Sequence, residues 1–251
     1  VIRRDFTVNG LLCDPTSGEV FDHVGGIDDL HRGILRTIGD PDRRFSEDYL
    51  RILRAVRFTV RLGFELDSGT REAARHHAGK LSVLSAERVR DEVEKMLLGP
   101  HPGRAFELMR ELGILRVILP EIDALHGVEQ PPAFHPEGDV FAHTMIMLER
   151  MCHPTRELAW SVLLHDVGKP ATFHIHEDGV IHFYGHEAVG GRMAESILTR
   201  LRCSASLVKN VSAAVANHMK FASVDRMKRS TWLKMIAAPT FPTDMELNSV
   251  D

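Results

Sequence analysis

The sequence predicts a mainly α-helical protein with short β elements in two places. Apolar residues recur at three- and four-residue spacing from Asp40 to about Pro100 and again after residue 139, as in amphipathic helices. Short alternating segments bounded by turn residues occupy the first 37 residues and the stretch from Ala171 to Tyr184. With 251 residues, 43% of them hydrophobic, the chain can form one large or two modest domains.

The composition argues against a membrane-embedded or disulfide-stabilised protein. No apolar run reaches the roughly 18 residues that a membrane span requires, and no signal peptide is visible. The cysteines Cys13, Cys152 and Cys203 are far apart and form no CxxC pair. We therefore expect a cytoplasmic protein with no membrane partner. Because the chain starts at Val1 rather than at a methionine and stops abruptly at Asp251, we also expect a piece of a longer protein.

The N-terminal region predicts strands and turns. The segment Phe6–Leu12 is strand-like, the turn residues Asp14–Gly18 follow, and Val20 with Phe21 could return as a hairpin partner. The glycine pair 25–26 predicts a further break in the chain.

Helices are predicted from Asp40 to Leu112. Ser46 is a candidate N-cap, followed by a helix with an apolar face and an opposite face of arginines. The apolar face contains Ile52, Leu53, Val56 and Val60, and the arginine face contains Arg51, Arg54, Arg57 and Arg61. Further helices are predicted over 68–77, 85–98 and 103–112, the last two ending at glycines.

The second half of the chain predicts a helical domain behind a linker. Gln130-Pro131-Pro132 is typical of a linker. Helices are predicted over about 139–151, 156–166, 186–201 and 204–218. Between the second and third of them, a small β-hairpin centred on Asp178-Gly179 is predicted.

The most specific motif is the segment Leu163–Pro170, in which an apolar helix ends in an adjacent His165 and Asp166 before a glycine and a proline. At a helix end both side chains can turn toward one ion. Imidazole with carboxylate suits divalent metals such as Zn, Mn, Fe, Co or Mg. His143 lies 22 residues earlier on an apolar helix face, which makes it a third candidate ligand. The alternative is a structural role for these side chains.

Further candidate ligands follow at helix-length intervals. His186 lies 20 residues after Asp166, His218 lies 32 after His186, and Asp251 lies 33 after His218. One ligand per helix is how a helical bundle builds a metal site in its core. For His186 and His218, plain core packing is the alternative to a ligand role. Lys169 could neutralise a phosphate beside the metal or cap the helix end. Such a site could hydrolyse a phosphoester.

Two features of the first half suggest nucleotide binding. From His31 to Arg61 there are eight arginines against four acids, and arginine suits forked contacts with phosphates and base edges. Asp48 and Arg51 are three residues apart on the predicted helix, so they are neighbours on one face. They could form a plain intrahelical salt bridge. A carboxylate beside a guanidinium could also recognise the Watson–Crick edge of a base.

The chain resembles the bacterial tRNA nucleotidyltransferase (CCA-adding enzyme)/poly(A) polymerase family, in the branch that carries an HD domain. The resemblance rests on RRDFTVNGLLCDP (3–15), the run 22–64, SAERVRDEVEKML (85–97), LLHDVGKP and FYGHE, which occur in family order. It implies a remnant of the nucleotidyltransferase head over 1–37, a helical neck and body that binds nucleotide and RNA over 38–128, and an HD domain over 129–251.

The resemblance also implies roles for individual residues. CTP and ATP would be the substrates, and tRNA or another RNA 3′ end the partner. The implied nucleotide-binding residues are Arg3, Arg4, Asp5, Asn9, Asp48, Arg51, Arg54, Glu87, Arg88 and Arg90. The implied catalytic residues of the HD site are His165, Asp166 and Lys169, around Mg, Mn, Ni, Co, Fe or Zn. Of the candidate metal ligands, the resemblance implies His143, His165, Asp166 and Asp251, and it gives a lesser rank to the further candidates His186 and His218.

One departure from the family limits the expected activity. Nucleotidyl transfer in the family needs a glycine-rich segment and a DxD carboxylate pair that hold Mg, and both lie upstream of the RRDFT motif. Gly25-Gly26 follows that motif and lacks the partner carboxylates. We therefore expect the chain as given not to add nucleotides. Two alternatives stay open: a stand-alone HD metal phosphohydrolase or phosphodiesterase, and a non-catalytic RNA-binding scaffold.

Overall fold

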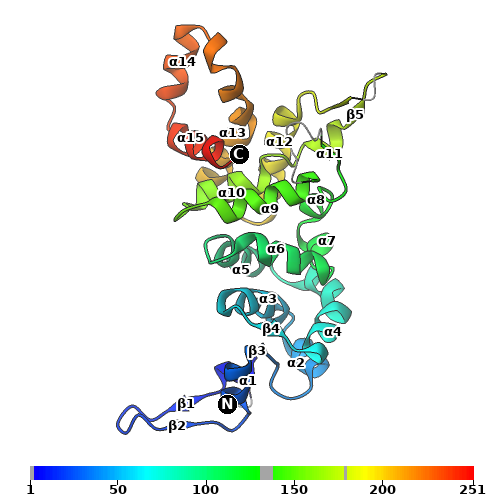
Figure 1. Ribbon diagram of the computed structural model, residues 1–251, viewed down its shortest axis with the longest axis vertical. Helices are drawn as coiled ribbons and strands as arrows, with labels where there is room; N and C mark the ends of the chain where they lie inside the picture. The colour runs from blue at the N-terminus through cyan, green and yellow to red at the C-terminus, as the bar shows by residue number, and fades with distance from the viewer. Residues whose placement is uncertain (1–2, 131–137, 178–179) are drawn as a thin grey trace. The chain divides into compact units, whose positions relative to one another are not determined.

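The computed structural model describes residues 3–130, 138–177 and 180–251, and it is mainly helical, as predicted. The chain divides into two compact units, Val1–Ile118 and Leu119–Asp251, whose elements are coloured in chain order in Figure 1. In the described part of the chain, no helix combines the length and the apolar character that crossing a bilayer requires.

The first unit begins with a small hairpin. Strand β1 (Leu12–Cys13) pairs antiparallel with β2 (Val20–Phe21), which confirms the predicted return of the chain. The predicted strand over Phe6–Leu12 is largely wrong, because Thr7–Asn9 form a 3-10 turn, η1. Side chains stabilise this turn: the Thr7 hydroxyl donates to Asp29 at 2.7 Å, and the Asn9 amide donates to Asp5 at 3.2 Å.

Helix α1 (Gly26–Arg32) begins where the glycine pair predicted only a break. Gly25 has a φ of 76°, and a Cβ on Gly26 would lie 2.3 Å from the Thr7 carbonyl oxygen, so both positions require glycine. The Asp22 carboxylate accepts hydrogen bonds from the backbone amides of Gly26 and Ile27 at the start of this helix. These hydrogen bonds, that from Ile27 first, lower the pKa of Asp22 to about 2.

Two consecutive helices follow instead of one. Helix α2 (Pro41–Glu47) begins after Asp40, whose side chain accepts a hydrogen bond from the Arg43 amide. The prediction that Ser46 is an N-cap is therefore wrong, because Ser46 lies inside α2. Asp48 has extended backbone, and α3 (Leu50–Leu62) starts two residues later. The predicted apolar face of α3 is buried.

The remaining helices of the first unit pack on α3, on α2 or on one another. They are α4 (Ser68–His77), the 3-10 turn η2 (Ala78–Val83), α5 (Ala86–Leu97), α6 (Pro102–Glu111) and α7 (Leu115–Ile118). The three predicted helices in this stretch are confirmed to within about one residue at each end. A parallel pair of short strands, β3 (Ile34–Leu35) and β4 (Glu65–Leu66), packs against α3 and had no counterpart in the prediction.

The second unit is also helical. It contains α8 (Pro120–Asp123), α9 (Val140–Arg150), α10 (Arg156–Leu164), α11 (Lys169–Thr172), α12 (His186–Arg200), α13 (Ala205–Asn217), η3 (His218–Arg226), α14 (Arg229–Ile236) and α15 (Phe241–Val250). The four predicted helices of this half are confirmed, whereas α14 and α15 were not predicted. Trp160 of α10 is fully buried in the core of this unit.

The predicted hairpin is confirmed by its two strands. Strand β5 (His174–Ile175) pairs antiparallel with β6 (Ile181–His182). Its expected centre, Asp178-Gly179, lies outside the described residues, as do Pro131 and Pro132 of the predicted linker.

Helices α12 and α13 approach closely because α12 carries two adjacent glycines. A Cβ on Gly190 would lie 3.2 Å from a Val215 methyl, and one on Gly191 would lie 3.0 Å from the Ala216 Cβ. This packing places the beginning of α12 near the end of α13, and both positions carry a histidine.

Candidate functional site

The histidine–aspartate pair lies in the turn that follows α10. His165 and Asp166 are almost completely buried, at 1% and 2% exposure. The Asp166 carboxylate is the centre of the cluster. One of its oxygens lies 3.0 Å from Nε2 of His165 and 2.6 Å from Nζ of Lys169. The other lies 3.4 Å from Nε2 of His186 and 3.8 Å from Nε2 of His218.

Three of the histidines are held by the same local contact. The Nδ1 atoms of His165, His186 and His218 lie 2.7–2.8 Å from the carbonyl oxygen of the residue three positions earlier. A carbonyl oxygen only accepts, so each Nδ1 carries a proton and donates it. Each Nε2 is therefore the ring nitrogen with a free lone pair whenever the imidazole is neutral. This is the tautomer that a metal-binding histidine adopts when its other nitrogen is anchored.

Two features of the histidine ring nitrogens fit a bound cation. Nε2 of His165 is buried and has no hydrogen-bond partner of good geometry in the described part of the chain. Nε2 of His186 lies 3.1 Å from Nε2 of His218, so two acceptor lone pairs would face each other unless a proton or a metal ion lies between or beside them. The donor set of imidazoles and a carboxylate suits a divalent transition metal.

His143 and Asp251 complete the cluster. His143 is buried on α9, and its Nε2 lies 3.1 Å from an Asp251 carboxylate oxygen. Within this cluster, metal-ligand atoms come close together in two groups of three residues, one formed by His143, His165 and Asp166 and the other by Asp166, His186 and His218. Asp166 belongs to both groups. The structure therefore brings together all six side chains that the sequence named as metal ligands.

The protonation equilibria agree with a site that attracts positive charge. Burial opposes the charged form of His165, but the carboxylates of Asp166 and Asp251 prevail and raise its pKa. Burial and then the neighbouring His165 lower the pKa of His218 to about 4, so this imidazole is neutral at pH 7. Burial acts against ionisation of Asp251, yet its contact with His143 and the charge of His165 lower its pKa to about 2.

The cluster opens into a cavity of about 700 Å³. Its lining includes the charged side chains of Asp166, Lys169 and Asp251. It also includes the apolar and aromatic side chains of Ile181, Phe183, Tyr184, Met219 and Phe221. Lys169 is held by two contacts, one with Asp166 and one with Gln130 Oε1 at 2.5 Å. Gln130 and the aromatic wall were not predicted, because neither follows a ligand-spacing pattern.

The first unit contains a second polar pocket, with a volume of about 330 Å³. Eight of the ten predicted nucleotide-binding residues line it, namely Arg3, Arg4, Asp5, Asn9, Asp48, Arg51, Arg54 and Arg88, together with Leu50. Glu87 and Arg90 do not line it: Glu87 is exposed, and Arg90 pairs with Asp91 at 2.7 Å.

The ion pairs of this pocket differ from the simplest prediction. Asp48 does not pair with Arg51; it accepts from Arg88 of α5 at 2.7 Å, and Arg51 pairs with Glu47 at 2.7 Å. The extended backbone of Asp48 breaks the helix, so the three-residue spacing no longer makes Asp48 and Arg51 neighbours on one face. Asp5 accepts from Arg54 at 2.6 Å.

Three families match successive parts of the chain. Residues 1–36 match the poly A polymerase head domain, residues 63–125 match the probable RNA and SrmB-binding site of polymerase A, and residues 140–238 match the HD domain.

Curated relatives and solved structures agree with these matches. A multifunctional CCA protein of Pasteurella multocida is 35% identical over 93% of this chain and 57% of the relative, and one of Nitrosomonas europaea is 39% identical over 80% and 48%. The CCA-adding enzyme of Bacillus stearothermophilus, solved in complex with CTP, has a TM-score of 0.71 and 25% identity, covering 99% of this chain and 53% of the other. The chain thus spans about half the length of the relatives it matches.

Proposed function

Because the chain belongs to the tRNA nucleotidyltransferase/poly(A) polymerase family with an HD domain, of which it contains a portion, we propose that it combines the base-selecting neck of such an enzyme with a metal-dependent phosphohydrolase domain. In this proposal the chain comprises a head remnant over 1–37, a neck and body over 38–128 and an HD domain over 129–251. The substrates of the neck are CTP and ATP, and the macromolecular partner is a tRNA or another RNA 3′ end.

The observation that carries the neck proposal is the charge of the pocket in the first unit. Five arginines and two aspartates line it, and Glu47 pairs with one of these arginines, Arg51, which leaves two excess positive charges for a triphosphate. Asp48 and Arg88 form an acceptor–donor pair at its wall, the arrangement that hydrogen bonding to a base edge requires. We propose that Asp48 and Arg51 contact the base, with Arg88 holding Asp48 in place.

Nucleotide binding tests this proposal directly. Asp48→Asn should weaken binding of CTP and ATP to the chain about tenfold or more, because a base donor then loses a charged acceptor. Asp28→Asn, which changes an exposed carboxylate outside the pocket, is the matched control. Isothermal titration of both variants measures the effect. Equal affinities for the two variants and the wild type would contradict a base-binding role for Asp48.

For the second unit we propose hydrolysis of a phosphomonoester or a 2′,3′-cyclic phosphate. His143, His165, Asp166, His186, His218 and Asp251 would hold one or two divalent ions among Mg, Mn, Ni, Co, Fe and Zn. Such an ion supplies Lewis-acid polarisation of a phosphoryl group. The Lys169 ammonium, fixed by Asp166 and Gln130 at the cavity wall, would balance the charge of the phosphate oxygens.

Hydrolysis of 2′,3′-cyclic AMP and of p-nitrophenyl phosphate with added Mn, Ni or Co tests this domain. The hydrolytic activity of His165→Ala should be at least about 100-fold below that of the wild type. His174→Ala, on the exposed hairpin strand, should keep the wild-type activity. Activity that survives His165→Ala would not come from this site. Absence of any activity with all these metals would leave the chain as a binding module only.

The nucleotidyl transfer of the intact family enzyme requires Mg, and we propose that its carboxylates lie in the part of the relatives that this chain does not span. Extension of the chain by the corresponding segment should then confer CTP and ATP addition to a tRNA 3′ end, which the chain alone should lack.

A further inference from the structure

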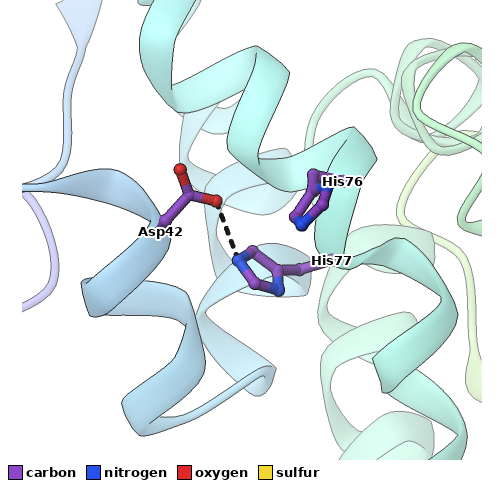
Figure 2. Close-up of side chains that lie close together, drawn as sticks. All are labelled: Asp42, His76 and His77. Carbon is purple, nitrogen blue, oxygen red and sulfur yellow. Dashed lines mark hydrogen bonds and ion pairs between the residues drawn. The ribbon is translucent and has the colours of Figure 1, made fainter.

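A second group of metal-ligand atoms lies in the first unit, in a different part of the chain from the HD cluster. It consists of Asp42 on α2 and of His76 and His77 at the end of α4. Figure 2 shows the Asp42 carboxylate directed toward the two imidazoles from the neighbouring helix. One ligand atom from each residue lies within 4.8 Å of the other two, and Nε2 of His77 is 2.9 Å from the Asp42 carboxylate.

The two histidines converge because of where they lie on their helix. Adjacent residues of a regular α-helix point about 100° apart. His76 and His77 are instead the last two residues of α4, which passes directly into the 3-10 turn η2. Their rings meet edge to face, with centroids 4.8 Å apart.

Well-anchored helices hold the three residues. The Asp40 and Asp67 side chains cap α2 and α4, and α4 packs against α2 and has Thr70, Ala73 and Ala74 buried. The His77 side chain is only 14% exposed and lies beside the Tyr49 ring, so its position is restricted. The side chains of Asp42, at 63% exposure, and of His76 have room to rotate.

We infer that Asp42, His76 and His77 form a second divalent-cation site, selective for a borderline metal such as Zn²⁺, Ni²⁺ or Co²⁺. Two imidazoles and one carboxylate are the protein donors of open zinc sites. In a tetrahedral site, ligand bonds of about 2.1 Å place the ligand atoms about 3.4 Å apart, so a small rotation of the exposed side chains closes the site. Mg²⁺ would be excluded, because it prefers oxygen donors.

The surroundings of the cluster can accept a cation. Glu72 lies one helical turn before His76 and lines the same surface hollow, where it can approach as a fourth oxygen donor. Neither Glu72 nor His76 makes a side-chain hydrogen bond or ion pair in the described part of the chain. Arg43 also lines the hollow, but its guanidinium faces Glu47 at 3.9 Å.

A bound ion would link α2 to α4. Asp48, which lines the pocket of the first unit, directly follows α2. The link would therefore restrict the motion of the backbone that carries Asp48. The predicted consequence is a rise in thermal stability with zinc, since a ligand that binds only the folded state stabilises it.

Zinc titration calorimetry of the untagged, chelator-treated chain tests the inference. His76→Ala and Asp42→Asn are both changes at exposed positions. Each should lower the wild-type zinc stoichiometry by one ion or weaken the affinity for that ion at least tenfold. His31→Ala changes another exposed histidine of this unit and should bind as the wild type does. The HD variant His165→Ala separates the two sites, because it should retain the zinc that His76→Ala loses.

Cobalt spectroscopy supplies an independent readout. Co²⁺ added to the His165→Ala variant should give visible absorption bands, and the double variant His165→Ala/His76→Ala should lose the part of this absorption that comes from one cobalt ion, because the group Asp166, His186 and His218 remains in both variants. Unchanged zinc stoichiometry, affinity and zinc-dependent thermal shift in both His76→Ala and Asp42→Asn would overturn the inference. Circular dichroism verifies that the variants are folded.

Discussion

Asp166 determines whether the HD cluster behaves as one site or as two. It belongs to both groups of ligand atoms, and both of its carboxylate oxygens face histidines. The histidines themselves are oriented by carbonyl oxygens three residues earlier, which is a contact internal to each helix end. The geometry of the cluster therefore depends on backbone positions that the folding of α10, α12 and α13 sets.

The Asp5–Arg54 pair gives a pH-dependent prediction. Burial acts against ionisation of Asp5, but hydrogen bonds and charge from Arg54 prevail and lower its pKa below 3.8. A lowered folded-state pKa contributes stability above the unfolded pKa, and this stability is lost as the pH falls through the folded value. Asp5→Asn should therefore unfold more easily than the wild type at pH 7, by about 1–2 kcal/mol.

The pH profile distinguishes this charge effect from a packing effect. The difference in unfolding free energy between Asp5→Asn and the wild type should narrow below about pH 4, as the wild-type carboxyl becomes protonated. Urea unfolding at several pH values measures it, with Asp28→Asn as the control. A difference that is the same at pH 3 and pH 7 would mean that the carboxylate charge is not responsible.

Single residues were predictable from sequence when their role depends on spacing. The six candidate HD ligands follow helix-length intervals, and their side chains lie in one cluster. The partner of Asp48 was not predictable in this way, because Arg88 lies 40 residues away on another helix. Likewise His76 and His77 follow no spacing pattern, and only the packing of α2 on α4 brings Asp42 to them.

At the scale of elements, periodicity located the long helices and missed those that tertiary contacts define. Helix α4 was predicted at its observed residues, because its buried Thr70, Ala73 and Ala74 recur at helical spacing. Helix α1 begins at a glycine pair and depends on the Asp22 carboxylate as a remote cap, so local propensity opposes it. The break between α2 and α3 falls at Asp48, which has extended backbone. It was not predicted, because no glycine or proline stands next to Asp48 in the sequence.

Gly168 gives a prediction about the contact between the HD turn and α12. A Cβ on Gly168 would lie 2.2 Å from the His186 carbonyl oxygen and 2.7 Å from the Gly190 backbone nitrogen. Both obstacles are backbone atoms, so the turn and α12 must separate to admit a methyl group. Gly168→Ala should therefore destabilise the chain by about 1–3 kcal/mol and displace His186 from Asp166.

The matched control is Gly79→Ala, because a Cβ there meets no atom within 4 Å. Thermal unfolding should show a clearly lowered midpoint for Gly168→Ala and almost no change for Gly79→Ala. Metal affinity of the HD site should fall with the first variant alone. Equal midpoints for the two variants would show that α12 can move aside at little cost.

At the scale of the whole molecule, the two compact units contain two different candidate sites. The first unit contains the arginine-lined pocket, and the second contains the buried histidine–aspartate cluster with its cavity. The sequence predicted a helical domain behind a linker and a local excess of arginine from His31 to Arg61, although the net charge of the chain is only −4. In the proposed three-part division and in the two compact units alike, the HD cluster and the arginine-lined pocket fall in different parts of the chain.

Removal of metal should therefore separate the two proposed activities. Chelation with EDTA should abolish phosphohydrolysis, because every donor of the HD cluster is then left without an ion. Binding of tRNA should survive chelation and depend instead on salt, since arginine contacts with phosphates release counterions. Between about 50 and 200 mM salt we expect the tRNA affinity to fall by at least tenfold. Filter binding and the phosphatase assay, run on one EDTA-treated sample before and after Mn is restored, measure both properties. Loss of tRNA binding on chelation, recovered with Mn, would mean that the metal site takes part in RNA binding and that the two units do not act independently.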